Sequence, residues 1–402
     1  MRLLLLTPQF PYPPHKGTAL RNYNIITHLA ARHEIDLLTF GEALPAEPTP
    51  VQRMCRRVAT VAAPARPTWR RALETLASRW PDMGLRLWST EFVRQLEAWL
   101  RADTYDIVQV EGIELARYGW RAKELCRPDR TLIVFDDHNA EYLLQERIAT
   151  AEREARGWTA GAFYSTIQAR KLRGFEQRVC RRFDRVAAVS EADAQALRLL
   201  DPALRAAVIP NGIDTDHYRR EAVPALDLPL PTLMFTGTMD FRPNVDAVLW
   251  FTREVLPSIQ AAMPDVQFYI VGQRPHTRLD VLRTNPAITI TGGVEDTRPY
   301  VAGAAVYVVP LRMGGGTRLK LLEAWSMKSP VVSTTLGAEG FEVVHGRELL
   351  LADEGAAFAR SVVELLRDRN RARALGEQGR LFAVAHYDWR SIVPRFEDVY
   401  RR

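Results

Sequence analysis

Short apolar runs alternate along the chain with longer segments in which apolar residues recur at helical spacing. A short, β-branched apolar run is typical of a buried strand, and a helical segment between two such runs predicts a parallel βαβ connection. The runs predict strands at 2–7, 34–40, 106–110, 131–135, 185–190, 233–236, 266–272, 288–291, 306–309, 331–334 and 348–351. The segment 208–214 predicts a short strand that leads into a Pro-Asn-Gly turn. The pattern therefore predicts an α/β protein whose two halves share one strand–helix rhythm.

The segments between these runs fall into two kinds. Some carry apolar residues at i, i+3 and i+4, as a helix packed on a sheet requires. These amphipathic segments are 18–31, 244–262, 317–327 and 388–400. Others are rich in arginine: 66–102 predicts two helices, and 152–183 predicts one long helical stretch.

Length and charge restrict the class of protein. At 402 residues the chain exceeds what one core ordinarily supports, so we expect two domains, with a proline-rich linker at 221–231. The net charge of +6 suits an anionic ligand or a membrane surface. Because the basic residues are interspersed with acidic ones and form no recognised nucleic-acid module, we expect no nucleic-acid partner.

The cysteines and apolar segments indicate the compartment. Cys55, Cys126 and Cys180 are far apart and match neither a zinc spacing nor a disulfide framework, which favours a reducing cytosol. Leu3–Leu6 is too short for a signal-peptide core or a membrane span. We therefore expect a cytoplasmic protein that is soluble or peripheral to the inner face of the membrane.

A glycine triplet stands between the strand at 306–309 and the helix at 317–327. Gly314, Gly315 and Gly316 would let a bulky anion approach the backbone there. The first N–H groups of a helix have no partner within the helix, and its dipole is positive at that end, so the junction predicts an anion site. The alternative is a tight turn with a solvated basic first turn.

Charged residues follow the triplet in an order that suits a diphosphate with a ribose behind it. Arg318 and Lys320 add positive charge in the expected first helical turn, after Thr317. Glu323 lies three residues beyond Lys320, on nearly the same helix face, and could accept hydrogen bonds from hydroxyl groups.

The segment GGGTRLKLLEAWSMKSPVVST (314–334) resembles the nucleotide-sugar signature of family 4 glycosyltransferases with the GT-B fold. The resemblance implies two Rossmann-like, doubly wound parallel-sheet domains that face a central cleft. It also implies that the turn, with Thr317, holds the diphosphate and that Glu323 binds the ribose. Gly315 departs from the pattern, because most members carry there a glutamate that helps to place the donor sugar.

The same resemblance implies the division of the chain. VIPNGID (208–214) matches the family segment at the crossing between domains. We expect an acceptor-side domain at 1–205 and a nucleotide-sugar-binding domain at 206–384. A terminal helix at 385–402 should cross back to the first domain.

Further donor residues are expected in the second half. Gly237 and Thr238 follow the strand at 233–236, where family members usually place an arginine and a lysine. Thr238 stands in the arginine's place, so Arg242 is the nearest cation and is given a supporting role. The turn with Gly293 and Val294 is expected to present backbone groups to the nucleobase, without separating uridine from guanosine.

Two residues in the first half are candidates. Gly17 begins the helix at 18–31, where a phosphate could approach or where the glycine simply caps the helix. His138, in DDHNAEY, follows the strand at 131–135, at the sheet edge where α/β proteins bind ligands. By position alone it could cap the next helix. The family loop often places there a histidine that faces the transferred sugar, which favours an active-site role. Asp136 and Asp137 are weaker candidates.

We therefore expect a retaining glycosyltransferase that moves a sugar from a UDP- or GDP-sugar to a glycan or lipid-linked acceptor in cell-surface polysaccharide or glycoconjugate synthesis. Arg318 and Lys320 would stabilise the leaving diphosphate, and His138 would orient a hydroxyl group. No Asp-x-Asp cluster suggests a metal site, so no metal or cofactor is expected. Two alternatives remain: a nucleotide-sugar epimerase and a non-catalytic sugar-nucleotide-binding subunit.

The arginine-rich segment 66–102 also contains Trp69, Trp80, Trp88 and Trp99. Basic and aromatic residues together can form a surface that settles on anionic lipid. We prefer the simpler interpretation of two domain helices with basic solvent faces, and the membrane contact stays a hypothesis.

Overall fold

The structure, a computed structural model, describes residues 1–14, 17–157, 159–314 and 318–401. It divides into two compact units. Unit 1 comprises Met1–Pro210 and Ile392–Arg402, and unit 2 comprises Asn211–Ser391. The boundaries between the units thus lie five to seven residues beyond those expected at 205 and 384.

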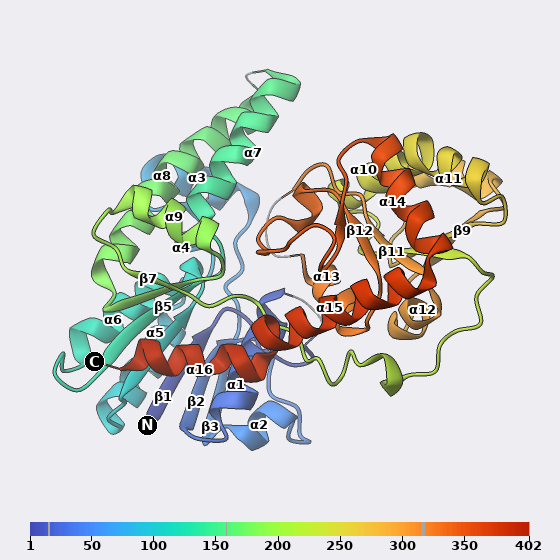
Figure 1. Cartoon of the computed structure of the whole chain (residues 1–402). Coiled ribbons are helices and arrows are strands. Elements are labelled where there is room, and N and C mark those ends of the chain that lie inside the picture. Colours follow the sequence, from blue (N-terminus) through green and yellow to red (C-terminus); the bar gives the residue numbers. More distant parts are fainter. Residues whose placement is uncertain (15–16, 158, 315–317, 402) are drawn as a thin grey trace. The chain divides into compact units, whose positions relative to one another are not determined.

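Unit 1 is built on a parallel sheet with helices on both faces (Figure 1). In the described part of the unit the sheet has seven strands in the order β3-β2-β1-β4-β5-β6-β7. The strands are β1 (Arg2–Thr7), β2 (Glu34–Phe40), β3 (Arg57–Val61), β4 (Ile107–Glu111), β5 (Leu132–Asp137), β6 (Arg185–Ala188) and β7 (Ala206–Val208). The helices are α1 (Gly17–Leu29), α2 (Pro50–Met54), α3 (Thr68–Ala77), α4 (Asp82–Leu85), α5 (Thr90–Ala102), α6 (Ala116–Leu125), α7 (Glu141–Arg156), α8 (Ala160–Arg182) and α9 (Glu191–Leu200).

Unit 2 repeats the architecture. Its described residues form a six-stranded parallel sheet in the order β10-β9-β8-β11-β12-β13. The strands are β8 (Thr232–Thr236), β9 (Gln267–Val271), β10 (Ile288–Gly292), β11 (Val306–Val309), β12 (Val331–Ser333) and β13 (Leu350–Leu351). The helices are α10 (Arg242–Trp250), α11 (Leu256–Ala262), α12 (Arg298–Gly303), α13 (Leu319–Ser326), α14 (Gly355–Arg367) and α15 (Arg369–Tyr387). The predicted α/β class with two Rossmann-like sheets is confirmed.

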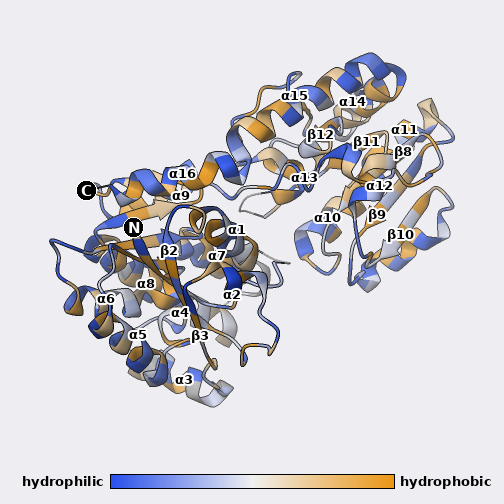
Figure 2. Ribbon diagram, turned by 90° about the horizontal axis from the view of Figure 1, so that it is seen from below, coloured by the Kyte–Doolittle hydropathy of each residue, from blue (hydrophilic) through white to orange (hydrophobic). Residues whose placement is uncertain are grey.

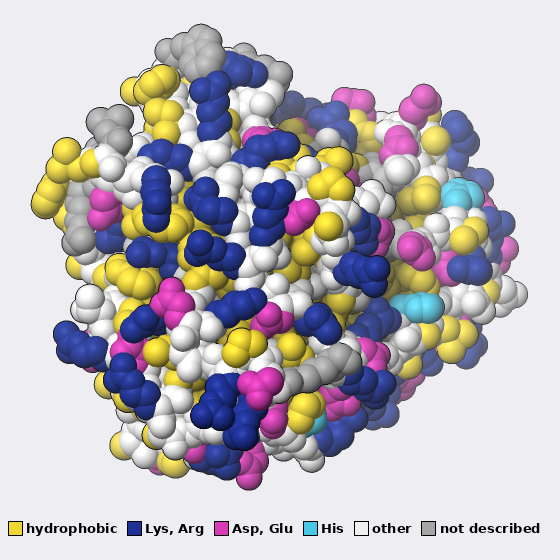
Figure 3. Space-filling model, turned by 90° about the vertical axis from the view of Figure 1, so that its left-hand side faces the viewer, with side chains coloured by type: hydrophobic (Ala, Val, Ile, Leu, Met, Phe, Trp, Pro, Cys, Tyr) yellow, Lys and Arg dark blue, Asp and Glu magenta, His cyan; other side chains and the backbone are white. Residues whose placement is uncertain are grey.

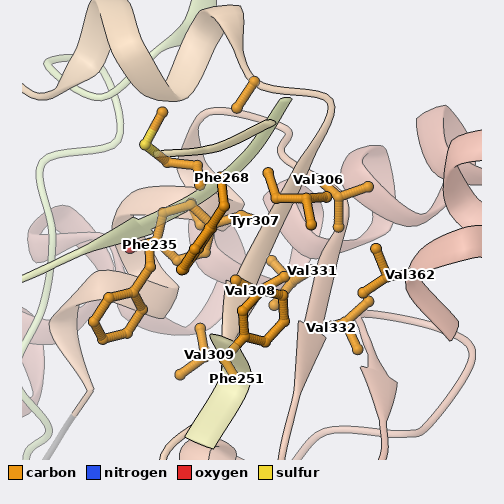
Figure 4. Packing of buried hydrophobic residues seen from close by; sticks show 14 of the residues in the cluster. Phe235, Phe251, Phe268, Val306, Tyr307, Val308, Val309, Val331, Val332 and Val362 are labelled. Carbon is orange, nitrogen blue, oxygen red and sulfur yellow. The ribbon is translucent and has the colours of Figure 1, made fainter. Parts of the chain in front are cut away.

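The core of unit 2 surrounds β11, whose four residues are all nearly inaccessible to solvent. Phe235, Phe251 and Phe268 pack with Tyr307 and the valines of β11 and β12 (Figure 4). A strand buried on both faces needs this unbroken apolar run, which is why the sequence pattern identifies it.

The terminal helix α16 (Trp389–Tyr400) alternates hydrophobic and hydrophilic residues along its length (Figure 2). Its predicted apolar stripe is buried: Trp389, Ile392, Val393, Phe396 and Tyr400. From Ile392 onward the helix belongs to unit 1, as the predicted fold requires.

Several predicted elements differ from the structure. β3 was not predicted, and the short strand expected before the turn in 208–214 is β7, which begins earlier, at Ala206, and ends at Val208. The stretch 152–183 contains the end of α7 and all of α8, and α7 ends before Gly157, which has φ +66°. The region 66–102 holds three helices rather than two.

The helix expected at 244–262 is interrupted by a π-helical turn at Phe251–Val255. Pro257, in the first turn of α11, has no N–H, so a regular α-helical hydrogen bond cannot form at that position. In the described part of the chain, no helix is both long and apolar enough to cross a membrane.

Each sheet reverses its strand order once, between β1 and β4 in unit 1 and between β8 and β11 in unit 2. Parallel α/β sheets bind ligands outside the carboxyl ends of the strands at such switch points. The fold therefore marks one candidate site in each unit, and the predicted residues can be compared with both positions.

Candidate functional site

In unit 2 the switch point brings together residues from three segments. Gly237 follows β8, Asn244 lies in the first turn of α10, and Lys320 and Glu323 lie on α13, which follows β11. Lys320 Nζ donates a hydrogen bond to Asn244 Oδ1 at 2.9 Å, and Asn244 Nδ2 donates to the Thr238 carbonyl at 3.0 Å. Asn244 thus ties the lysine to the loop after β8.

Lys320 sits over the ring of Phe235, with Nζ 4.0 Å from the ring centroid. Burial lowers the pKa of Lys320 to about 7, while the charge of Glu323 opposes this shift. Its partner amide is neutral, so among the described residues the ammonium has no anionic hydrogen-bond partner. A bound anion would supply one.

Glu323 is half-buried one turn further along α13. Burial raises the pKa of its carboxyl group, and the charge of Lys320 partly opposes the rise. The Tyr218 hydroxyl lies 3.4 Å from Glu323 Oε1. The carboxylate thus lies one helical turn behind the lysine, as the sequence predicted.

Arg318 directly precedes α13, which begins at Leu319 rather than at Thr317 as predicted. The side chain of Arg318 is buried, and burial lowers its pKa. Gly314 has φ +102°, and a Cβ atom placed there would lie 3.2 Å from Pro243 and 3.7 Å from Arg318 Nη1. The predicted anion-binding residues Gly315, Gly316 and Thr317 lie outside the described residues.

Glycines allow the loops at this edge of the sheet to approach closely. A Cβ atom on Gly237 would lie 2.7 Å from Asn244 Nδ2 and 3.1 Å from Lys320 Nζ. A Cβ atom on Gly272, after β9, would lie only 1.7 Å from the Gly237 carbonyl oxygen. Positions 237 and 272 therefore have no room for a side chain.

The remaining predicted residues of unit 2 have no hydrogen bond to Lys320 or Asn244 among the described residues. Arg242 is exposed at the start of α10. Gly293 and Val294 follow β10, two strands away from β8, where Gly293 faces Gln273 and Val294 packs on the core. Hydrogen bonds through Asn244 thus connect Lys320 to Thr238, beside Gly237. Glu323 lies one turn further along α13, and Gly314 lies beside Arg318.

In unit 1 the switch point holds His138. Its Nε2 lies 2.9 Å from Glu111 Oε2 at the end of β4, and its Nδ1 lies 3.5 Å from Thr18 Oγ1. Thr18 follows Gly17 in the first turn of α1, so the two predicted residues Gly17 and His138 lie in one region. Gly112, at φ +81°, keeps the space beside Nδ1 clear, because a Cβ atom there would lie 3.7 Å from Nδ1.

A buried ion pair supports this cluster. Arg21 Nε and Nη2 donate to the two carboxylate oxygens of Asp136 at 2.8 and 2.9 Å. Burial alone would raise the pKa of Asp136, but the charge and hydrogen bonds of Arg21 lower it. Arg21 also donates to the carbonyls of Ile209 and Pro210. Asp136 is therefore a structural ion-pair partner in β5 rather than a helix cap.

Among the described residues, Glu111, Asp136 and His138 place ligand atoms within 4.8 Å of one another. A cation there would compete with Arg21 for Asp136 and with Glu111 for His138 Nε2. The hydrogen bonds account for this grouping without a metal, and metal independence stays a prediction.

Sequence reasoning missed Asn244, Phe235 and Tyr218 in unit 2, and Arg21 and Glu111 in unit 1. The last two left a signal. Glu111 directly follows the predicted strand DIVQV, and Arg21 lies next to Leu20, on the predicted apolar side of its helix. A charge at such a position needs a buried partner.

Comparison with known proteins adds two family matches. The model described as Glycosyltransferase Family 4 matches residues 16–217. The model described as Glycosyl transferases group 1 matches residues 230–368. Together they include both candidate sites.

Curated relatives match about half of the chain. A GDP-mannose-dependent alpha-(1-6)-phosphatidylinositol monomannoside mannosyltransferase of Mycobacterium tuberculosis is 28% identical over 224 residues, which are 50% of this chain and 57% of that protein. A lipopolysaccharide core biosynthesis glycosyltransferase of Rhizobium meliloti is 25% identical over 143 residues, 34% of this chain and 42% of that protein. The matched part of the chain thus spans about half the length of these relatives.

Solved structures match over nearly the whole chain. Sucrose-phosphate synthase from Thermosynechococcus elongatus superposes with a TM-score of 0.69 at 18% identity, covering 100% of this chain and 98% of that one. HepE of Anabaena in complex with UDP gives 0.66 at 16% identity, covering 99% of each chain. These matches establish the GT-B type of fold.

Proposed function

Because the chain belongs to glycosyltransferase family 4, we propose that it transfers a hexose from a nucleoside-diphosphate sugar to an acceptor hydroxyl group. The observation that carries the proposal is the Lys320–Asn244 contact at the switch point of the second sheet. There a lysine with a depressed pKa lies next to the start of a helix and one turn ahead of a carboxylate.

The leaving diphosphate needs positive charge where the bond to the sugar breaks. Lys320 and the buried Arg318 supply it together with the positive end of the α13 dipole. These groups could act without a divalent ion, so metal independence is part of the proposal. Arg242, exposed on the neighbouring α10, adds long-range attraction for the donor.

The nucleoside would extend from Lys320 along α13. The ribose hydroxyl groups would donate to Glu323, and the base would lie towards Gly293 and Val294. Relatives named for GDP-mannose and a fold neighbour solved with UDP support both donor types, so the base is left as either.

The acceptor is proposed to be a glycan or glycolipid hydroxyl group in the synthesis of cell-surface polysaccharide or glycoconjugates. The names of the mycobacterial and rhizobial relatives support this class. His138 would orient a hydroxyl group through Nδ1, beside Gly17 and Thr18. Transfer with retention of the anomeric configuration follows from the resemblance to the family and is proposed with it.

Contact with an anionic membrane is a further part of the proposal. Apolar side chains stand exposed on two helices that touch each other: Trp69 (66%) and Leu73 (58%) on α3, and Phe163 (57%) on α8. Lys and Arg gather with hydrophobic side chains on one face of the molecule (Figure 3). Such a mixture suits anionic lipid.

The arginines beside these helices are crowded. Three guanidinium groups, those of Arg79, Arg117 and Arg178, lie 4.7, 5.3 and 5.5 Å from the ring centroid of Trp80. Burial and the charge of Arg79 lower the pKa values of Arg117 and Arg178. Lipid phosphates would relieve this repulsion.

The membrane contact can be tested with vesicles. The protein should sediment with phosphatidylglycerol vesicles at low salt. Exchanging both Trp69 and Leu73 for Ser should reduce the sedimented fraction, whereas Val281→Ser in unit 2 should leave it unchanged. Lack of sedimentation of the parent protein would remove the membrane contact.

The main proposal is tested by incubating the protein with UDP-glucose or GDP-mannose, with and without glycan and glycolipid acceptors. We expect a glycosylated acceptor whose new bond keeps the donor's anomeric configuration, and the product's NMR coupling constants measure this. An epimerised donor in the absence of acceptor would instead identify an epimerase. Donor binding without turnover on any acceptor would support a binding subunit.

A further inference from the structure

A chain of hydrogen bonds connects the last turn of α16 to His138. The Tyr400 hydroxyl donates to Gln109 Oε1, and Gln109 Nε2 donates to Glu111 Oε1 at 2.5 Å. The other oxygen of Glu111 lies 2.9 Å from His138 Nε2. Tyr400, Gln109 and Glu111 are all buried, so solvent does not compete for these bonds.

The direction of the chain follows from its chemistry. Because Gln109 turns its amide NH₂ towards Glu111, the carboxylate accepts at Oε1, and its second oxygen is free to accept from His138. His138 Nε2 then carries a proton. Nδ1 is left facing Thr18 and the clear space beside Gly112.

We propose that Glu111 is a positioning residue, which fixes the tautomer and ring orientation of His138 so that Nδ1 addresses a ligand hydroxyl group, and that Gln109 and Tyr400 fix Glu111 in turn. The value of this arrangement for sugar transfer rests on the proposed function. The positioning itself does not depend on turnover.

The charged groups around His138 come from several elements. Glu111 on β4, Asp136 on β5 and Arg21 on α1 surround it, Glu141 on α7 contributes a charge interaction, and Tyr400 on α16 closes the chain. Burial alone would lower the pKa of His138. The hydrogen bond and charge of Glu111, with the charge of Asp136, more than offset burial and raise it.

The test uses two nearly isosteric substitutions. Glu111→Gln keeps a hydrogen-bond acceptor but removes the charge, and Tyr400→Phe removes one hydroxyl group. Tyr118→Phe serves as the matched control, because the Tyr118 hydroxyl is also buried in unit 1 but bonds to the Leu87 carbonyl. The protein is labelled with ¹⁵N-histidine, and His138→Asn identifies the His138 signals among those of the eight histidines.

In the parent protein, at a pH above the pKa of His138, we expect the neutral ring in a single tautomer protonated on Nε2. Glu111→Gln should lower its pKa, Tyr400→Phe should make the tautomers mix, and Tyr118→Phe should change neither. The loss in kcat for Glu111→Gln should be roughly 10- to 100-fold, the scale of a hydrogen bond to a charged group, with the donor KM nearly unchanged.

An unchanged His138 pKa and tautomer in Glu111→Gln would overturn the proposal. If that variant does not fold, unchanged tautomers in Tyr400→Phe would overturn it equally. NMR shifts as expected in a protein that transfers no sugar would refute the proposed function and leave the positioning role intact.

Discussion

Lys320 makes donor binding sensitive to pH in a predictable direction. In the ligand-free protein its pKa is about 7, so much of the side chain is neutral just above this pH. A diphosphate favours the protonated form and raises the pKa on binding. Binding should therefore take up a proton between pH 7 and the pKa of the complex, and affinity should fall as the pH rises through that interval.

The size of the effect follows from the pKa difference. An opposite charge within about 4–6 Å moves a pKa by about 1–3 pH units, and each unit corresponds to about 1.4 kcal/mol. From pH 6 to 8.5 the dissociation constant should then rise roughly 7- to 30-fold. UDP-glucose and GDP-mannose suit the measurement, because their diphosphate esters do not titrate in this range.

Isothermal titration calorimetry at pH 8 in two buffers of different ionisation enthalpy counts the protons taken up. Lys320→Met should bind more weakly and lose the proton uptake. Arg318→Met should also bind more weakly but keep it, because an arginine stays charged throughout. A dissociation constant that does not change with pH, or a slope that survives in Lys320→Met, would refute the reasoning.

Three further predictions concern single residues. Glu323→Ala should weaken binding of UDP or GDP by about 1–3 kcal/mol through loss of the ribose hydrogen bonds, and unchanged calorimetric affinity would contradict the ribose assignment. Gly272→Ala should lower the free energy of unfolding by about 1–3 kcal/mol in urea titrations, because its Cβ would overlap the Gly237 carbonyl oxygen. A urea midpoint equal to that of the parent protein would show that the loop moves aside without cost. Arg21→Met should lower the free energy of unfolding by about 3–5 kcal/mol, because it leaves Asp136 unpaired. The same urea titration measures this loss, and a loss below about 1 kcal/mol would contradict the buried ion pair.

The strands that sequence analysis located best are the buried ones. β1 and β2 begin and end where predicted, because burial on both faces demands an uninterrupted apolar run. β3 was missed because RVATV is short, only half-buried and begins with an arginine, so its apolar signal is weak. Edge strands need less apolar surface, and their pattern is correspondingly harder to recognise.

The residues of the candidate sites also differ in how well sequence analysis could find them. Lys320 and Glu323 could be predicted together because their spacing lies within one helix. Asn244 and Tyr218 reach them from 76 and 105 residues away, and only the strand order brings these segments together. Glu111 and His138 likewise meet because β4 and β5 are neighbours, which no local pattern reveals.

The central claim is that a nucleoside diphosphate binds where the glycine turn meets α13. A crystal structure with UDP or GDP bound tests this most directly. We predict the diphosphate within hydrogen-bonding distance of Lys320 Nζ and the Arg318 guanidinium group, with the ribose hydroxyl groups on Glu323. A nucleotide bound with its diphosphate away from α13 would contradict the claim.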